Sequence, residues 1–243
     1  MTNPLPTSET VRGDEMPSAE RRARRRRPRL RRVLIGVGGV LLACGSVAGV
    51  DLVLEQHDQS TVSFRDPVSS VHADVSAGSV QLVGNDDPTV TLERRIESGI
   101  RGPSHDEWVD DGKLVIRSSC PLRVLTPACG VDYIVHVPRT VSVEVDGDGL
   151  SADIVGIDGS LDVSINGGDV DAQFHQAPTM IKARSNGGDI DIAVPDDGLA
   201  YRVDASSNGG SIEVDVRTNP ESDRVLDLYT NGGSIRVTYT GTP

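Results

Sequence analysis

The sequence predicts an all-β protein whose main domain is a single β-solenoid with about 20–23 residues per coil. The first observation is a recurring triplet, Asn-Gly-Gly, which begins at Asn166, Asn186, Asn208 and Asn231, with a variant, Asp-Gly-Asp-Gly, at Asp146. These anchors are separated by 20, 20, 22 and 23 residues. A nearly fixed period of this length indicates repeats that bury their apolar sides by stacking on one another.

The second observation is that apolar residues occupy the same places around every anchor. The positions five and three residues before it hold Val141, Leu161, Ile181, Val203 and Leu226, and then Val143, Val163, Ala183, Ala205 and Leu228. The positions four and six residues after it hold Leu150, Val170, Ile190, Ile212 and Ile235, and then Ala152, Ala172, Ile192, Val214 and Val237. Because polar residues lie between them, the pattern is typical of half-buried strands. We expect two strands per coil over residues 141–239.

The triplets are expected to form the corners between the two strands of each coil. Glycine accepts a positive φ without a Cβ clash, so a pair of glycines allows a sharp turn. Asn side chains stacked about 4.8 Å apart can form an amide ladder along the stack. The predicted corner residues are Asn166, Gly167, Gly168, Asn186, Gly187, Gly188, Asn208, Gly209, Gly210, Asn231, Gly232 and Gly233. Unrelated hairpin turns would not explain the spacing.

The N-terminal part of the 243-residue chain has a different character. Residues 1–32 carry ten Arg and four acidic residues, whereas the chain from Asp51 onward carries 14 basic and 32 acidic residues. An uncharged apolar span, 33–50, follows the Arg-rich segment, and residues 52–54 extend it. By the positive-inside rule we predict a disordered cytoplasmic tail, 1–32, and a transmembrane anchor, 33–54. The Arg run is expected to contact anionic lipids rather than nucleic acid.

A second interpretation of the anchor stays open. The residues before Gly45, Leu-Leu-Ala-Cys, resemble a bacterial lipobox that ends at Cys44. Cleavage there would remove the Arg tract and leave a lipid-modified Cys44. The apolar run continues beyond Cys44, which favours an uncleaved anchor. In both cases the chain after the anchor is tethered to the membrane and faces outward.

The next segments are less regular. Residues 55–70 are polar and predict a linker, and residues 71–82 already show the repeat in a degenerate form. We expect residues 71–140 to form about three irregular coils, interrupted by a loop at 98–112 that contains Trp108. The regular coils then complete a domain of residues 71–243. Cys120 and Cys129 are close in sequence, and in an exported domain they are expected to form a disulfide.

This combination of features resembles a known family. It comprises the Arg-rich tail, a single apolar span, the segment 118–138 with both cysteines, and Ser-Asn-Gly-Gly repeats that end in an Arg-Val-Thr-Tyr strand. Over residues 33–239 the chain resembles membrane-anchored actinobacterial members of the putative-adhesin β-solenoid family, a bacterial domain family of unknown function. The resemblance implies the fold and a cell-surface location, and it supplies no catalytic residues.

The candidate binding face lies just after the corners. Its residues are Asp169, Asp171, Asp189, Asp191 and Glu213, which stacking would bring together as a ladder of carboxylates. A calcium ion could relieve their repulsion, but Ser211, Ser234 and Arg236 interrupt the ladder at its C-terminal end and favour a solvated face.

The sequence favours a protein that is not an enzyme. The five His residues fall singly, and no phosphate loop, dinucleotide fingerprint or metalloprotease helix is present. Arg184 and Arg202, the candidates for a lyase-like base, lie on the other strand from the acidic residues. We expect a membrane-anchored adhesin-like binding protein or envelope scaffold, without a cofactor, whose partner is an envelope glycan or protein. The alternatives are an envelope sensor or structural protein, and a polysaccharide lyase-like enzyme.

Overall fold

A computed structural model describes residues 56–98, 102–120 and 129–241, and the predicted tail and anchor lie outside them. In this part of the chain every regular element is a strand, so the all-β class is confirmed. It contains no helix that is long and apolar enough to cross a membrane. The strands are β1 (Gln56–Phe64), β2 (Ser70–Asn85), β3 (Val90–Ser98), β4 (Ser104–Asp110), β5 (Lys113–Ser119), β6 (Cys129–Pro138), β7 (Ser142–Ile157), β8 (Leu161–Asn166), β9 (Val170–Phe174), β10 (Met180–Ser185), β11 (Ile190–Val194), β12 (Arg202–Ser207), β13 (Ile212–Val214), β14 (Val225–Thr230) and β15 (Ile235–Tyr239).

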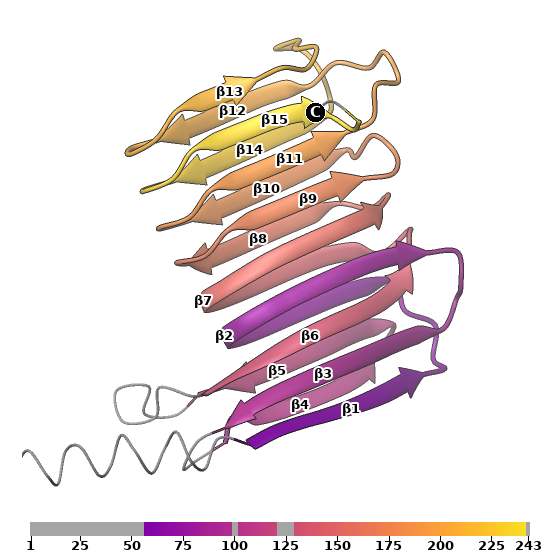
Figure 1. Ribbon diagram of the computed structural model, residues 1–243. Coiled ribbons are helices and arrows are strands. Elements are labelled where there is room, and N and C mark those ends of the chain that lie inside the picture. Colours follow the sequence, from indigo (N-terminus) through magenta and orange to yellow (C-terminus); the bar gives the residue numbers. More distant parts are fainter. Residues whose placement is uncertain (1–55, 99–101, 121–128, 242–243) are drawn as a thin grey trace, which may run out of the picture. The chain divides into compact units, whose positions relative to one another are not determined.

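The strands form two facing layers, which are joined at the corners (Figure 1). The pre-corner sheet has the order β4-β5-β2-β7-β8-β10-β14-β12, and the post-corner sheet has the order β1-β3-β6-β2-β7-β9-β11-β15-β13. The long strands β2 and β7 bend at their corners, so each contributes its first half to one sheet and its second half to the other. From the coil of β2 to the outermost coil, which contains β12 and β13, neighbouring coils pair in parallel.

The coils do not stack in chain order at the C-terminal end. β14 lies between β10 and β12, with Leu226 opposite both Ile181 and Val203, and β15 lies between β11 and β13. The last coil is therefore inserted between two earlier ones (Figure 1). Leu226 is buried in the inner coil, whereas Ile212 in the outer coil is 44% exposed. This order buries the bulkier apolar set of the last coil and leaves a smaller one at the edge of the stack.

The N-terminal part differs from the three predicted irregular coils. β2, which contains the degenerate repeat, forms a coil directly beside β7. β5 and β6 also pair parallel with β2, on the edge away from β7, whereas β1 with β3, β3 with β6, and β4 with β5 are antiparallel pairs. The predicted linker at 55–70 contains β1, and the predicted loop at 98–112 contains β4 with Trp108. Each of these strands lies at the edge of a sheet, where polar side chains are tolerated. Their sequences therefore lack the apolar alternation that marks a strand inside a sheet.

The variant corner is shifted by two residues from its predicted register. Asp148, rather than Asp146, lies opposite Asn166, and Val143 rather than Val141 lies opposite Leu161. A shift of two residues preserves which side chains face inward, because side chains alternate with a period of two. The apolar pattern therefore could not distinguish the two registers.

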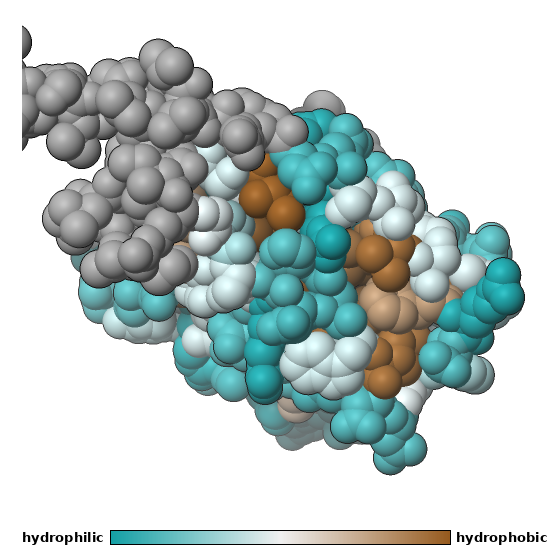
Figure 2. All heavy atoms as spheres, turned by 90° about the horizontal axis from the view of Figure 1, so that it is seen from below, coloured by the Kyte–Doolittle hydropathy of each residue, from teal (hydrophilic) through white to brown (hydrophobic). Residues whose placement is uncertain are grey.

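The inward-facing residues of both sheets form one hydrophobic core, which polar contacts close at the β1–β4 end. There Nη1 of Arg94 on β3 donates a hydrogen bond to Oε2 of Glu107 on β4, at 2.6 Å, across the two sheets. The buried hydroxyl of Tyr133 donates to Oε1 of Glu107, at 3.3 Å, and burial together with the Glu107 charge raises the pKa of Tyr133. Figure 2 views this end of the stack and shows small apolar areas bordered by hydrophilic side chains. The ion pair thus caps the core.

Candidate functional site

The predicted binding face is divided into two rows by the structure. Asp169 and Asp189 form the row nearest the corners. Oδ1 of Asp169 accepts a hydrogen bond from the backbone N–H of Asp189, at 2.9 Å, and Oδ1 of Asp189 accepts one from the backbone N–H of Ser234, at 2.7 Å. These carboxylates therefore join one coil to the next, although both residues are exposed. One oxygen of each carboxylate therefore has a structural role through a charge-assisted bond to backbone, and a part of these two residues in ligand binding stays a prediction.

The second row is two residues further along the strands, on the outer surface of the post-corner sheet. Asp171 lies opposite Asp191, Asp191 opposite Arg236, and Arg236 opposite Glu213. These residues line a groove of about 590 Å³, together with Asp215, Ile192, Ala193 and Thr238. The groove has four carboxylates and one guanidinium group in its lining. Its charge suits a cationic or hydrogen-bonding ligand.

Arg236 occupies the middle of this row rather than its end. Its Nη1 donates a hydrogen bond to Oδ1 of Asp191 at 2.9 Å, and its Nε is 3.6 Å from Oε2 of Glu213. The predicted position at the end of the ladder was wrong because the last coil is inserted before the coil that carries Glu213. The insertion brings a cation between two carboxylates that would otherwise repel each other.

Charge is least compensated at the opposite end of the row. Burial raises the pKa of Asp171, and the neighbouring carboxylates Asp153 and Asp191 raise it further. A bound cation would relieve this repulsion. Within the described residues, however, the groove does not bring three carboxylate ligand atoms within 4.8 Å of one another, as a preformed calcium site would require. The groove is better suited to a larger ligand that contacts several carboxylates.

The corner residues are structural in this arrangement. Nδ2 of Asn186 donates to Oδ1 of Asn166 at 3.3 Å, and Nδ2 of Asn208 donates to Oδ1 of Asn231 at 2.8 Å. Nδ2 of Asn166 donates to Oδ1 of Asp148 at 3.1 Å. Side-chain bonds of the expected ladder type therefore join neighbouring coils.

A row of hydroxyl groups just before the corners was missed by the sequence interpretation. The hydroxyl of Thr230 donates to the carbonyl of Gly188 at 2.8 Å and accepts from the N–H of Gly233 at 3.2 Å. The hydroxyls of Ser185 and Ser207 make equivalent bonds: each donates to a glycine carbonyl of a neighbouring coil and accepts from a glycine N–H of its own corner. The sequence does contain a pattern that could have indicated these bonds, since a Ser or Thr directly precedes Asn in three of the four triplets.

Replacing Thr230 by Val should lower the free energy of unfolding by about 1–3 kcal/mol, because it leaves buried backbone groups without their partner. The side chain keeps its shape, and Thr230 is 0% exposed, so the hydroxyl is the main change. Chemical denaturation of the two proteins measures this difference. The control is Thr179→Val, at an exposed position, which should change stability by less than about 0.5 kcal/mol. Equal stability of the Thr230 variant and the parent would contradict a structural role for this hydroxyl.

The predicted disulfide is present between Cys120, after β5, and Cys129, at the start of β6. The two Cα atoms are 5.9 Å apart, which is a normal separation for a disulfide. The bond joins the ends of a pre-corner and a post-corner strand.

The structure also locates the residues considered for catalysis. Arg184 on β10 donates to Oδ2 of Asp227 at 2.8 Å, and Arg202 is on β12, so both are in the pre-corner sheet. The acidic groove is on the post-corner sheet, which separates it from both arginines. His175 is 3.0 Å from Asp158, and His72 lies near Glu144 and Asp146, a grouping that the sequence interpretation missed.

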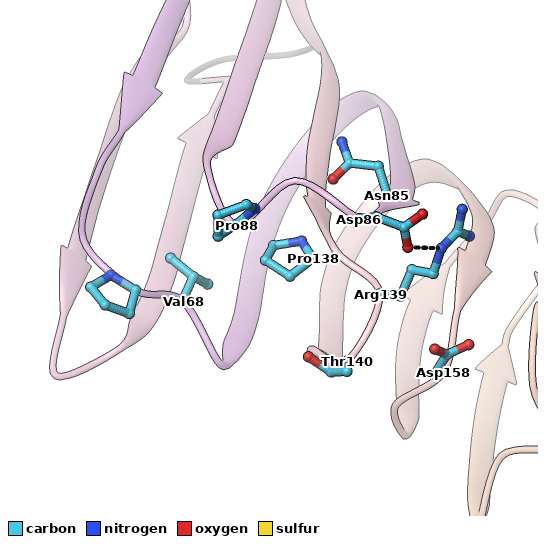
Figure 3. Close-up of a pocket in the computed structure, with 9 residues that line it drawn as sticks. Val68, Asn85, Asp86, Pro88, Pro138, Arg139, Thr140 and Asp158 are labelled. Atoms are coloured by element: carbon cyan, nitrogen blue, oxygen red, sulfur yellow. Dashed lines mark hydrogen bonds and ion pairs between the residues drawn. The ribbon is translucent and has the colours of Figure 1, made fainter.

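A second pocket, of about 360 Å³, lies at the corners opposite the triplets (Figure 3). Its lining includes Val68, Pro88, Pro138 and Arg139. Nε of Arg139 donates to Oδ1 of Asp86 at 2.9 Å, and Nη1 donates to the carbonyl of Gly156 at 3.0 Å. Arg139 therefore joins its own loop to the loop between β2 and β3 and to the end of β7, which accounts for its position without a ligand.

Comparisons with known proteins support the fold. The crystal structure of a putative cell adhesion protein from Clostridium sporogenes ATCC 15579 matches with a TM-score of 0.54 at 11% identity, covering 76% of this chain and 100% of that chain. The crystal structure of a putative adhesin from Bacteroides fragilis NCTC 9343 covers 75% of this chain and 97% of that chain, with a TM-score of 0.33 at 13% identity. No curated protein matches. The family model described as Toastrack DUF4097 matches residues 141–238, which contain all four Asn-Gly-Gly corners. We conclude that residues 141–238 are a domain of the Toastrack DUF4097 family, and that the described part of the chain has a fold similar to that of the putative cell adhesion protein.

Proposed function

We propose that the protein is a non-catalytic binding scaffold of the cell envelope, tethered by residues 33–54, with the acidic groove as its binding site. The observation that carries the proposal is the row of Asp171, Asp191 and Glu213, which parallel pairing holds at fixed spacing on the outer surface. Such a row provides a preorganised set of carboxylates, so little ordering is needed when a ligand binds.

The chemistry of the groove defines the partner class. Four carboxylates and one guanidinium group line it, and the domain from Asp51 onward is strongly acidic. We infer that the partner presents cationic groups, as a basic protein segment or an amino-bearing envelope glycan does. Polyanions such as nucleic acids would be repelled.

The tether follows from the sequence rather than from the described residues. Nine Arg residues directly before an uncharged span favour an orientation with the folded domain outside the cell. A solved structure with a similar fold is titled a putative cell adhesion protein, which supports a surface role.

The proposal is tested with the purified full-length chain and isolated envelope material from the cells that produce it. The variant Asp171→Asn/Asp191→Asn should bind this material at least about fivefold more weakly, because it removes two charges from the groove. The binding of the parent chain should also weaken as salt is raised. A co-sedimentation assay measures both effects.

The matched control is Asp106→Asn/Asp204→Asn, which removes the same number of charges from exposed positions of the pre-corner sheet. It should bind as the parent chain does. Equal loss in both variants would show that only net charge matters, and it would contradict a site in the groove. Cleavage of envelope polysaccharide by the parent chain, with loss of activity in the groove variant, would instead replace the binding function with a lyase-like one.

A further inference from the structure

A group of metal-ligating side chains lies on the other sheet, away from the acidic groove. His72 on β2 is directly opposite Glu144 on β7, and the pair Asp74 and Asp146 follows two residues further along. Since residues two apart share a face of a strand, these side chains point outward together. The first halves of β2 and β7 lie in the middle of the pre-corner sheet, where neighbouring strands on both sides fix their backbones.

The three ligand atoms are already close together. One ligand atom each from His72, Glu144 and Asp146 lie within 4.8 Å of one another. Nδ1 of His72 is 2.9 Å from Oε2 of Glu144 and 4.0 Å from Oδ2 of Asp146. Atoms that coordinate one ion at about 2.0–2.2 Å are separated by roughly 3–4 Å, so small side-chain movements would complete the geometry.

The ring nitrogen of His72 is a second, independent observation. Nδ1 is buried and makes no hydrogen bond of acceptable geometry, and Oε2 of Glu144 lies 2.9 Å from it. A buried polar atom without a partner costs free energy, and such atoms in native proteins often have a role. A metal ion placed between the ring and the carboxylates would satisfy this atom.

The surrounding charges leave room for a cation. Glu144 has one competing cation, since Nζ of Lys113 is 3.3 Å from its Oε2. Asp162, which is opposite Glu144 on β8, is already paired with Lys182 at 3.0 Å. Among the described residues Asp146 has an ion-pair contact with His72 alone.

We propose that His72, Glu144 and Asp146 bind a divalent transition-metal ion, with Zn²⁺ as the expected occupant. One imidazole and two carboxylates form the mixed N/O donor set that Zn²⁺ accepts, and water would complete a four-coordinate site. Calcium and magnesium prefer all-oxygen sites, so they should bind more weakly. Half of the Glu144 side chain is exposed, so the ion can enter from solvent.

The bound ion would join two strands that are far apart in sequence. β2 belongs to the N-terminal half of the domain, whereas β7 begins the matched family region. An ion that binds only the folded state stabilises that state by mass action. Zinc is therefore expected to raise the melting temperature of the chain.

The test is titration of the untagged full-length chain with ZnCl₂, followed by calorimetry and by the melting temperature. The parent chain should bind one equivalent of Zn²⁺, and His72→Gln and Asp146→Asn should each weaken binding by at least about tenfold. Titration with CoCl₂ supplies a separate readout, because the visible absorption of bound Co²⁺ changes when a ligand is lost. CaCl₂ and MgCl₂ serve as hard-cation controls.

Two further variants keep the test specific. His175→Gln alters another His–carboxylate pair, which has two ligand groups rather than three, and it should leave zinc affinity unchanged. Lys113→Met removes the cation that competes for Glu144, so it should preserve or increase the affinity. The proposal is overturned if the parent binds Zn²⁺ no more tightly than the His72 variant, or if Lys113→Met weakens binding. Metal-free melting temperatures, and the Asp146 variant, separate loss of a ligand from loss of folding.

Discussion

Replacing Gly188 by Ala is expected to destabilise the stacked coils by at least about 3 kcal/mol, the upper range for overpacking a closely packed interior. A Cβ atom at Gly188 would be 1.9 Å from the carbonyl oxygen of Gly168 and 2.6 Å from Oδ1 of Asp169. The first of these atoms is backbone of the neighbouring coil, which cannot rotate away. The coils would have to separate at this corner and lose hydrogen bonds between β9 and β11.

The preceding glycine provides the control for this prediction. A Cβ atom at Gly187 would meet its nearest neighbour, the Cα of Gly167, at 3.6 Å, which is an ordinary contact. Neither Gly187 nor Gly188 has a positive φ. Gly187→Ala should therefore change the free energy of unfolding by less than about 0.5 kcal/mol, as measured by chemical denaturation. Similar losses in the two variants would contradict the close-approach argument.

These two glycines show where the sequence interpretation of the corner was incomplete. It assigned both glycines of each triplet to a turn with positive φ, yet among the corner glycines only Gly167 and Gly168 have such a φ. At the second glycine of the other triplets, Gly188, Gly210 and Gly233, the requirement is that two backbones approach closely. A sequence shows that a side chain is missing, but it does not show which neighbour excludes it.

The inward and outward assignment within each repeat could be predicted, whereas the stacking order could not. Ile190, Ile192, Leu226 and Val237 are buried as expected, because alternation within a strand is a local property of the sequence. The insertion of the last coil depends on which coil leaves the smaller apolar surface at the edge, and every coil has the same pattern. Arg236 was therefore assigned to the end of the acidic row, although it lies between Asp191 and Glu213.

Groups of side chains from distant segments could not be predicted either, because they also depend on the stacking order. His72 and Glu144 are adjacent only because β2 pairs directly with β7. The four strands between them in sequence lie beyond the other edge of β2. Aligning residues 71–75 with 143–147 would have placed His72 beside Glu144, but nothing in the sequence selects that pairing over others. Glu107 was missed as a buried residue because its partners, Arg94 and Tyr133, belong to other strands.

The second large effect is expected for Ile190→Asp, which introduces a carboxylate between the two sheets. Ile190 is 0% exposed, and it lies opposite Val170 and Ile235 in the neighbouring coils. An unpaired buried carboxylate should cost several kcal/mol, roughly 3–5 by comparison with other buried charges, so the variant is expected to be unfolded or nearly so.

The loss should depend on pH in a defined direction, because burial favours the neutral acid and raises the pKa of the new carboxyl in the folded state. A group with a raised folded pKa contributes least destabilisation below its unfolded pKa, about 3.9, and more as pH rises toward the folded value. The deficit relative to the parent should therefore be smaller near about pH 4 than near pH 7. Asp191→Asn, one residue further on the outer face, loses one exposed ion pair with Arg236 and should cost no more than about 0.5 kcal/mol at either pH. Denaturant unfolding at both pH values measures these differences, and equal losses at positions 190 and 191 would show that the assigned faces of β11 are wrong.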